Sequence, residues 1–195
     1  MLIHPLTPLS ASPLTPVVFM PGLNGDGAAT LARVKRVAEA LLTFPTLLVF
    51  PEVGTAESPE VWAATLAKAA QDHTLTDRGL VFGHNHGADQ ACQFTLDHPG
   101  DVAACVALSA EVWADPTVED PQRLSETAWM IGCGESDTAE RIRAAQAFQV
   151  GLAERGCRVD LLDWEGGHDE LPHHTLENAM YFFNETQNAL HRSAA

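Results

Sequence analysis

The residues best suited to chemistry lie in one short stretch, Gly83-His84-Asn85-His86-Gly87. Two glycines spaced around a central residue form the frame of a nucleophile elbow, a sharp turn between a strand and a helix. The central residue of that frame is normally a nucleophile, and here it is Asn85. An amide offers no proton that a histidine could usefully remove, and its oxygen is a poor nucleophile. The stretch therefore predicts the geometry of a hydrolytic site with an unsuitable residue at its centre.

Two further residues could complete such a site. Asp137 follows the apolar run 128–133, and His168 follows the run 159–162 within a Gly-Gly-His sequence. A histidine oriented by a carboxylate is a general base, so His168 is the expected base and Asp137 the residue that orients it. Along the chain the order is nucleophile position, acid and histidine, which is the order of the α/β-hydrolase arrangement.

Apolar runs and amphipathic stretches alternate along the chain, which predicts an α/β fold with a mostly parallel sheet of about six strands and helices on both faces. Residues 1–195 are expected to form a single three-layer domain with no lid domain, and 1–16, which contain four prolines, an extended arm or edge strand. The strands are expected at 17–20, 47–50, 79–83, 102–108, 128–133 and 159–162. The carboxyl ends of these strands should hold the ligand site.

On these motifs the chain resembles the α/β-hydrolase superfamily, and within it the phospholipase/carboxylesterase group that includes acyl-protein thioesterases and dienelactone hydrolase. The similarity runs from about Pro16 to about Asn188. The resemblance implies that Asn85 occupies the position of the serine nucleophile. It also implies that the backbone N–H groups of Leu23 and His86 are the oxyanion-hole donors.

The sequence departs from this family at two places. The family's His-Gly after the first strand is Pro21-Gly22 here, and the elbow serine is Asn85. Asn tolerates a positive φ comparatively well, so Asn85 could suit the strained turn without any chemical duty. Asp137 could simply cap the helix that follows it, and His168 could be satisfied by a backbone carbonyl.

Three functional hypotheses remain open for this site. His168 could activate water directly in a slow esterase-like hydrolase, with a small ester- or acyl-type ligand as the partner. Deamidation of Asn85 to Asp would supply the carboxylate nucleophile that some members of the superfamily use. The third hypothesis is a non-catalytic binding protein, a pseudoenzyme with a degenerate catalytic triad on a hydrolase scaffold. No cofactor is expected, and no catalytic metal, because the histidines lack a settled ligand spacing.

The amino-acid composition argues against some classes of binding partner. The 195 residues carry 26 acidic and 11 basic side chains, a formal net charge of −15, which argues against nucleic acid or an anionic membrane as the partner. No run of apolar residues is long enough to span a bilayer, and no signal peptide is evident. The four cysteines lack paired spacing and are expected to be buried free thiols in the cytoplasm. The oligomeric state is left open, with a homo-oligomer among the alternatives.

Overall fold

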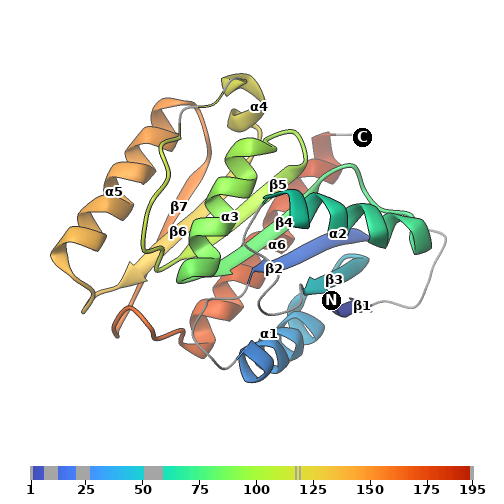
Figure 1. Ribbon diagram of the computed structural model, residues 1–195, viewed down its shortest axis with the longest axis horizontal. Coiled ribbons are helices and arrows are strands. Elements are labelled where there is room, and N and C mark those ends of the chain that lie inside the picture. Colours follow the sequence, from blue (N-terminus) through green and yellow to red (C-terminus); the bar gives the residue numbers. More distant parts are fainter. Residues whose placement is uncertain are drawn as a thin grey trace.

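The computed structural model describes residues 2–6, 13–20, 27–50, 59–116, 118 and 120–193. The described chain forms one seven-stranded sheet with the strand order β1-β3-β2-β4-β5-β6-β7 (Figure 1). The strands are β1 (Leu2–Pro5), β2 (Thr15–Met20), β3 (Thr46–Phe50), β4 (Gly79–His84), β5 (Val102–Leu108), β6 (Ala128–Gly134) and β7 (Val159–Trp164). Strands β2 to β7 are parallel, which confirms the predicted α/β architecture.

Helices cover both faces of this sheet. They are α1 (Gly27–Leu41), α2 (Pro59–Asp72), α3 (His86–Asp97), α4 (Pro121–Ser125), α5 (Ala139–Glu154) and α6 (His173–Ser193). Helices α2, α3 and α5 pack on one face and α1 and α6 on the other, as Figure 1 shows. The result is the three-layer arrangement that the alternation of strands and helices predicts.

The first strand is the antiparallel edge of the sheet. Leu2 pairs with Phe50 and Pro5 with Leu47 of β3, so the predicted edge strand occupies the beginning of the 1–16 segment. Strand β2 begins at Thr15, two residues before the expected start, and Pro16 lies opposite Leu47 within the ladder.

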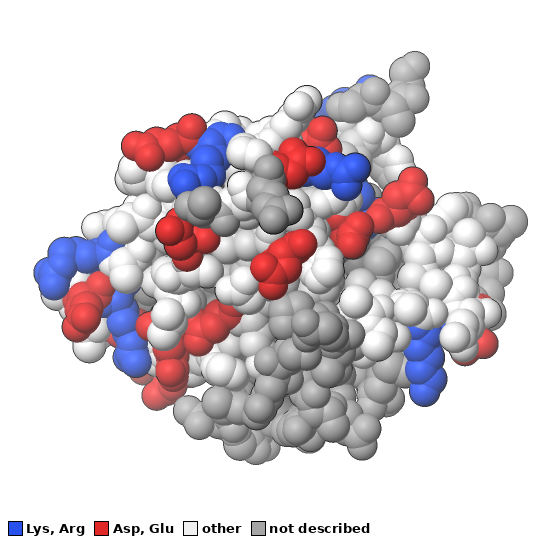
Figure 2. All heavy atoms as spheres, turned by 45° about the horizontal axis from the view of Figure 1, so that its top comes forward, with Lys and Arg blue, Asp and Glu red and all other residues white. Residues whose placement is uncertain are grey.

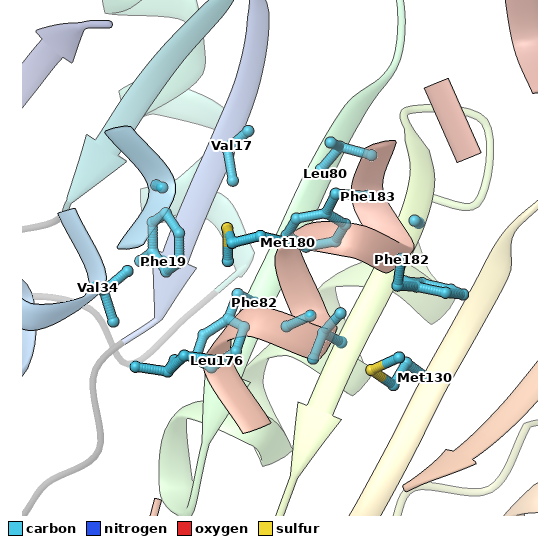
Figure 3. Close-up of a cluster of buried hydrophobic side chains, with 14 of the residues drawn as sticks. Val17, Phe19, Val34, Leu80, Phe82, Met130, Leu176, Met180, Phe182 and Phe183 are labelled. Carbon is cyan, nitrogen blue, oxygen red and sulfur yellow. The ribbon is translucent and has the colours of Figure 1, made fainter. Parts of the chain in front are cut away.

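The core on the α1 and α6 face shows why the strands are held so firmly (Figure 3). Phe19 of β2 stacks on Phe50 of β3 with ring centroids 5.1 Å apart, and it contacts Phe82 of β4 at 5.4 Å. Met180 and Phe183 of α6 are fully buried against these strands. Each such side chain contributes roughly 1.5–3 kcal/mol by leaving water. This packing fixes β4 in the middle of the sheet, and the elbow is attached to its end.

Three details differ from the sequence-based expectation. Between the strands expected at 102–108 and 128–133 the chain forms the short helix α4, which Asp120 caps by accepting the N–H of Arg123 at 3.1 Å. Strand β7 reaches Trp164, two residues beyond the predicted end, because the pairing with β6 continues. Helix α5 is capped by Thr138 rather than by Asp137.

The described surface carries both signs of charge. On the face shown in Figure 2, acidic side chains spread over much of the surface and Lys and Arg side chains lie among them. No helix among the described residues is long and apolar enough to cross a membrane. All four cysteines are free, and three of them, Cys92, Cys105 and Cys157, are buried, whereas Cys133 is half-buried.

Candidate functional site

The elbow forms where the sequence predicts it. Asn85 joins β4 to α3 with φ 53° and ψ −129°, which confirms the expected positive φ. Its N–H donates to the carbonyl of Leu108 at 3.0 Å, and its carbonyl accepts the N–H of Ala88 at 2.7 Å, so both backbone groups are engaged. A Cβ at Gly83 would lie 2.0 Å from the carbonyl oxygen of Gly87, which is why only glycine fits there.

His168 and Asp137 meet as predicted. Nδ1 of His168 lies 2.8 Å from Oδ2 of Asp137, whose side chain is 1% exposed. Burial alone would raise the pKa of Asp137, but hydrogen bonds from His168 and from the N–H of Thr138, together with the nearby Arg141, hold it below its ordinary value. Asp137 is therefore an ionised partner that fixes the orientation of the imidazole.

Two interlocked loops bring this pair together. The N–H of Ser136 donates to the carbonyl of Gly166 at 2.9 Å, which ties the loop after β6 to the loop after β7. A Cβ at Gly134 would lie 2.3 Å from the same carbonyl oxygen. The close approach of the two glycines places Asp137 and His168 at hydrogen-bond distance, a contact that strand order alone does not determine.

Asp169 is a site residue that the sequence analysis missed. Nδ2 of Asn85 donates to Oδ1 of Asp169 at 3.0 Å, so the elbow side chain is anchored to the residue that follows His168. The only sequence signal was the position of Asp169 next to the expected base. The elbow, the base and the acid thus come together at the carboxyl edge of the sheet, through a carboxylate that the hydrolase pattern does not include.

The structure describes one of the two residues expected to form the oxyanion hole. His86 is the first residue of α3, where the N–H groups have no carbonyl partner within the helix, and its expected role as a donor stays a prediction. Leu23, the other expected donor, lies outside the described residues, as do Pro21 and Gly22. His86 Nδ1 lies 3.5 Å from Oδ2 of Asp89, one turn along α3.

Asp89 also links the elbow helix to the segment after β5. Its Oδ1 accepts the N–H of Val112 at 2.9 Å. Burial raises the pKa of Asp89, although this hydrogen bond and the nearby His86 oppose the rise. The carboxylate therefore holds the segment 110–116 beside the first turn of α3.

His84 is the last residue of β4 and directly precedes the elbow residue. Burial, with smaller contributions from the nearby His168 and Arg33, lowers the pKa of His84 to about 4. Arg33 of α1 donates to the carbonyl of Leu171 and so fixes the far end of the loop that carries His168. His84 is thus a neutral ring near neutral pH and a poor candidate for proton transfer there.

Several polar atoms around the elbow are buried without a hydrogen-bond partner in the described part of the chain. They are Nε2 of His84, Oδ1 of Asn85, Oγ of Ser109 and Nε2 of His168. Ser109 directly follows β5, whose last residue, Leu108, accepts the N–H of Asn85, and it is with Asn85 one of two described non-glycine residues at positive φ. Such a concentration of unsatisfied groups and backbone strain is typical of functional sites.

An open groove of about 790 Å³ lies at the start of α5. The segment after β5 forms one wall and the first half of α5 the other, and the groove reaches Thr138 and Arg141, next to Asp137. Trp113 and Phe148 line it with ring centroids 5.2 Å apart. Among the described residues no three His, Cys, Asp or Glu side chains are grouped so that they could hold a metal ion.

No protein-family model matches the sequence, and no curated protein matches it. Solved structures do match. A ferulic acid esterase has a TM-score of 0.75 at 16% identity, over 90% of this chain and 86% of that one. Esterase PE8 has a TM-score of 0.69 at 20% identity, covering 94% and 97%, and the Bacillus cereus carboxylesterase 0.67 at 14%, covering 94% and 93%.

These neighbours share the parallel sheet and the flanking helices over nearly the whole chain, while their sequence identity is low. The strained elbow at Asn85 and the contact of His168 with Asp137 lie at the carboxyl edge of that sheet. The chain has the fold of the α/β-hydrolase superfamily.

Proposed function

We propose that this chain binds a small ester- or acyl-type ligand at the carboxyl edge of β4, β6 and β7, and that it does not form the acyl-enzyme of a serine esterase. One observation carries the proposal. His168 is held by Asp137 at 2.8 Å, as in a working base, while the residue in the strained elbow is an amide. Among the described residues the base, the acid and the strained elbow are present, whereas the residue at the nucleophile position cannot form a covalent intermediate.

The groove at the start of α5 supports a ligand with an apolar part. Trp113 and Phe148 give it an aromatic wall, and Ala144 and Ala147 of α5 leave room between that wall and the solvent. Its position next to Thr138 would let a ligand carbonyl lie near His168 while the apolar chain occupies the groove. The structural neighbours named as esterases agree with an ester or acyl group as the ligand class.

The side chain of Asn85 cannot act as a covalent nucleophile. The Asn85 amide nitrogen donates to Asp169, so the nitrogen lone pair, already delocalised into the carbonyl, does not face a substrate. Ordinary serine-esterase activity is therefore expected to be weak or absent. A fluorophosphonate probe, which labels activated serines, should leave the wild-type protein unlabelled. Stoichiometric labelling of another serine, with Ser109 and Ser136 the first to inspect, would contradict this.

Ligand binding can be tested with a butyl trifluoromethyl ketone, observed by fluorine NMR. The ketone should bind the wild-type protein, and Ala144→Trp should weaken binding at least tenfold by filling the groove. Val150→Trp is the matched control, because Val150 is exposed on the same helix and does not line the groove. Equal binding to all three proteins, or no binding to any, would contradict the proposal.

A non-catalytic binding protein is the second candidate. The anchoring of Asn85 by Asp169 favours it, since a fixed amide suits a binding surface as well as a reaction centre. In that case esters, thioesters and haloalkanes are untouched, and His168→Ala alters ligand affinity without altering any rate.

A further inference from the structure

The orientation of the Asn85 amide is fixed by chemistry. A carboxylate oxygen accepts hydrogen bonds, so the NH₂ group of Asn85 faces Oδ1 of Asp169 at 3.0 Å. The oxygen, Oδ1, then points away from Asp169. Asn85 is only 9% exposed, and Oδ1 is buried without a partner in the described part of the chain.

The orientation of the His168 imidazole likewise follows from its hydrogen bond to a carboxylate. Nδ1 faces the carboxylate of Asp137 at 2.8 Å and therefore carries a proton. In the neutral ring Nε2 then presents a lone pair, and this atom is also buried without a partner among the described residues. Two acceptors, Asn85 Oδ1 and His168 Nε2, are thus left unpaired at the same edge of the sheet.

The two residues that carry these acceptors are linked through Asp169, which accepts a hydrogen bond from the Asn85 amide and follows His168 in the chain. An unsatisfied buried acceptor is destabilising, so the two atoms favour an occupant that donates hydrogen bonds. An ester has no such donor, whereas water has two O–H groups and can donate one to each acceptor. Its lone pairs then remain free to face an ester carbonyl.

We propose that Asn85 Oδ1 and His168 Nε2 together hold the nucleophilic water of an ester hydrolysis, and that Asp169 is a positioning residue that fixes the Asn85 amide. The inference rests on the proposed function, since it needs an ester bound at this edge. Asn85 is then a catalytic residue that acts on water, in place of a nucleophile that forms a covalent bond.

The reaction balances without a cofactor. The water oxygen forms a bond to the acyl carbon while one water proton passes to Nε2 of His168, and Asp137 stabilises the imidazolium. The N–H of His86 can donate to the oxyanion. The bond from the acyl carbon to the alkoxy oxygen then breaks, and Nε2 returns the proton to the departing oxygen. A carboxylic acid and an alcohol leave, and no acyl group is attached to the protein.

The test uses p-nitrophenyl butyrate and the full chain. Wild-type protein should hydrolyse it slowly but above the spontaneous rate, with no acyl adduct in intact mass spectra taken during turnover. Asn85→Ala should lower kcat roughly tenfold or more while KM changes less than about threefold, because one hydrogen bond to the nucleophile is lost. Unchanged kcat in Asn85→Ala, or an adduct, would overturn the inference.

The positioning role of Asp169 is tested by comparing the kcat values of a set of variants. Asp169→Ala frees the amide to rotate and should lower kcat roughly tenfold, whereas Asp169→Glu, which keeps a carboxylate, should recover part of the loss. Glu165→Gln removes one charge from the same loop and should leave kcat unchanged, since Glu165 is exposed. A kcat that falls equally in Asp169→Ala, Asp169→Glu and Glu165→Gln would show a general charge effect and overturn the positioning role.

A crystal structure at atomic resolution gives a second, independent test. A water within hydrogen-bond distance of both Asn85 Oδ1 and His168 Nε2 supports the inference, and direct contact between these atoms overturns it. If the trifluoromethyl ketone binds but the ester is not hydrolysed, ligand binding stands and the water site is wrong. If the ketone does not bind either, the proposed function itself fails.

Discussion

Asp137 accepts hydrogen bonds through both carboxylate oxygens. Oδ2 receives Nδ1 of His168 at 2.8 Å, and Oδ1 receives the N–H of Thr138 at 2.7 Å, at the start of α5. The carboxylate therefore orients the base and is itself held by the first N–H groups of a helix, where negative charge is favoured. Cap geometry at the start of α5 accounts for the second contact, whereas the first contact fixes the orientation of the His168 ring.

Deamidation of Asn85 is opposed by its neighbour. Asn85→Asp would place a second carboxylate about where the amide nitrogen now lies, 3.0 Å from Asp169 Oδ1. Like charges at this range repel, so urea unfolding at pH 7 should show a loss of about 2 kcal/mol or more, which shrinks as acid neutralises the pair. The matched control is Asn188→Asp on the exposed side of α6. We expect the intact mass of purified protein to match an amide at position 85.

The elbow should not tolerate a side chain at Gly83. Gly83→Ala puts a Cβ 2.0 Å from the backbone oxygen of Gly87, and backbone cannot move aside as a flexible side chain can. We expect a loss of at least about 3 kcal/mol in the free energy of unfolding. Gly167→Ala is the control, since no atom lies within 4 Å of its Cβ and its φ is not positive, and it should change stability by less than about 0.5 kcal/mol. Equal losses of stability in Gly83→Ala and Gly167→Ala would show that the close approach of Gly83 to the Gly87 backbone does not cause the destabilisation.

Much of this arrangement could be predicted from sequence because it depends on local signals. The apolar runs identify the parallel strands, and the two glycines around Asn85 predict the turn. The contact with Asp169 could not be predicted, because it depends on how the loop after β7 folds back across β4. The positive φ of Ser109 could not be predicted for a similar reason. The N–H of Ser109 donates to the carbonyl of Gly132 on β6, which is its neighbour in the sheet and is distant in the sequence.

His84 should make stability depend on pH in a defined window. Its pKa is lowered from 6.5 to about 4 in the folded protein, so the unfolded state binds the proton more tightly. The contribution of the neutral His84 ring to the free energy of unfolding is fully present above pH 6.5 and is lost as the pH falls toward 4. Between pH 7 and pH 4.5 this residue should remove about 2–3 kcal/mol from the free energy of unfolding.

That loss should be smaller in His84→Gln, which cannot take up a proton, than in the wild-type protein. The control is His173→Gln, because the His173 side chain is 64% exposed. Urea unfolding at several pH values measures the difference. Asp137, whose pKa is lowered, loses its contribution only as pH falls further, below the ordinary range of an Asp, so the two effects are separable. A His84→Gln profile parallel to that of the wild type would contradict the assignment.

Replacing the elbow residue with serine tests whether the remaining groups can still act together. Asn85→Ser removes the amide bonded to Asp169 and supplies a hydroxyl that a base can deprotonate. Serine is smaller than asparagine and meets no steric barrier, although it tolerates the φ of 53° less well. Because His168 is already oriented by Asp137, we expect fluorophosphonate labelling at position 85 and a clear gain in hydrolysis of p-nitrophenyl butyrate, with a transient acyl adduct in intact mass spectra. Both should disappear in the double variant Asn85→Ser with His168→Ala, since this removes the ring that Asp137 orients as the base. An Asn85→Ser protein that folds normally, yet is neither labelled nor active, would show that more than the nucleophile has been lost and would favour the binding-protein alternative.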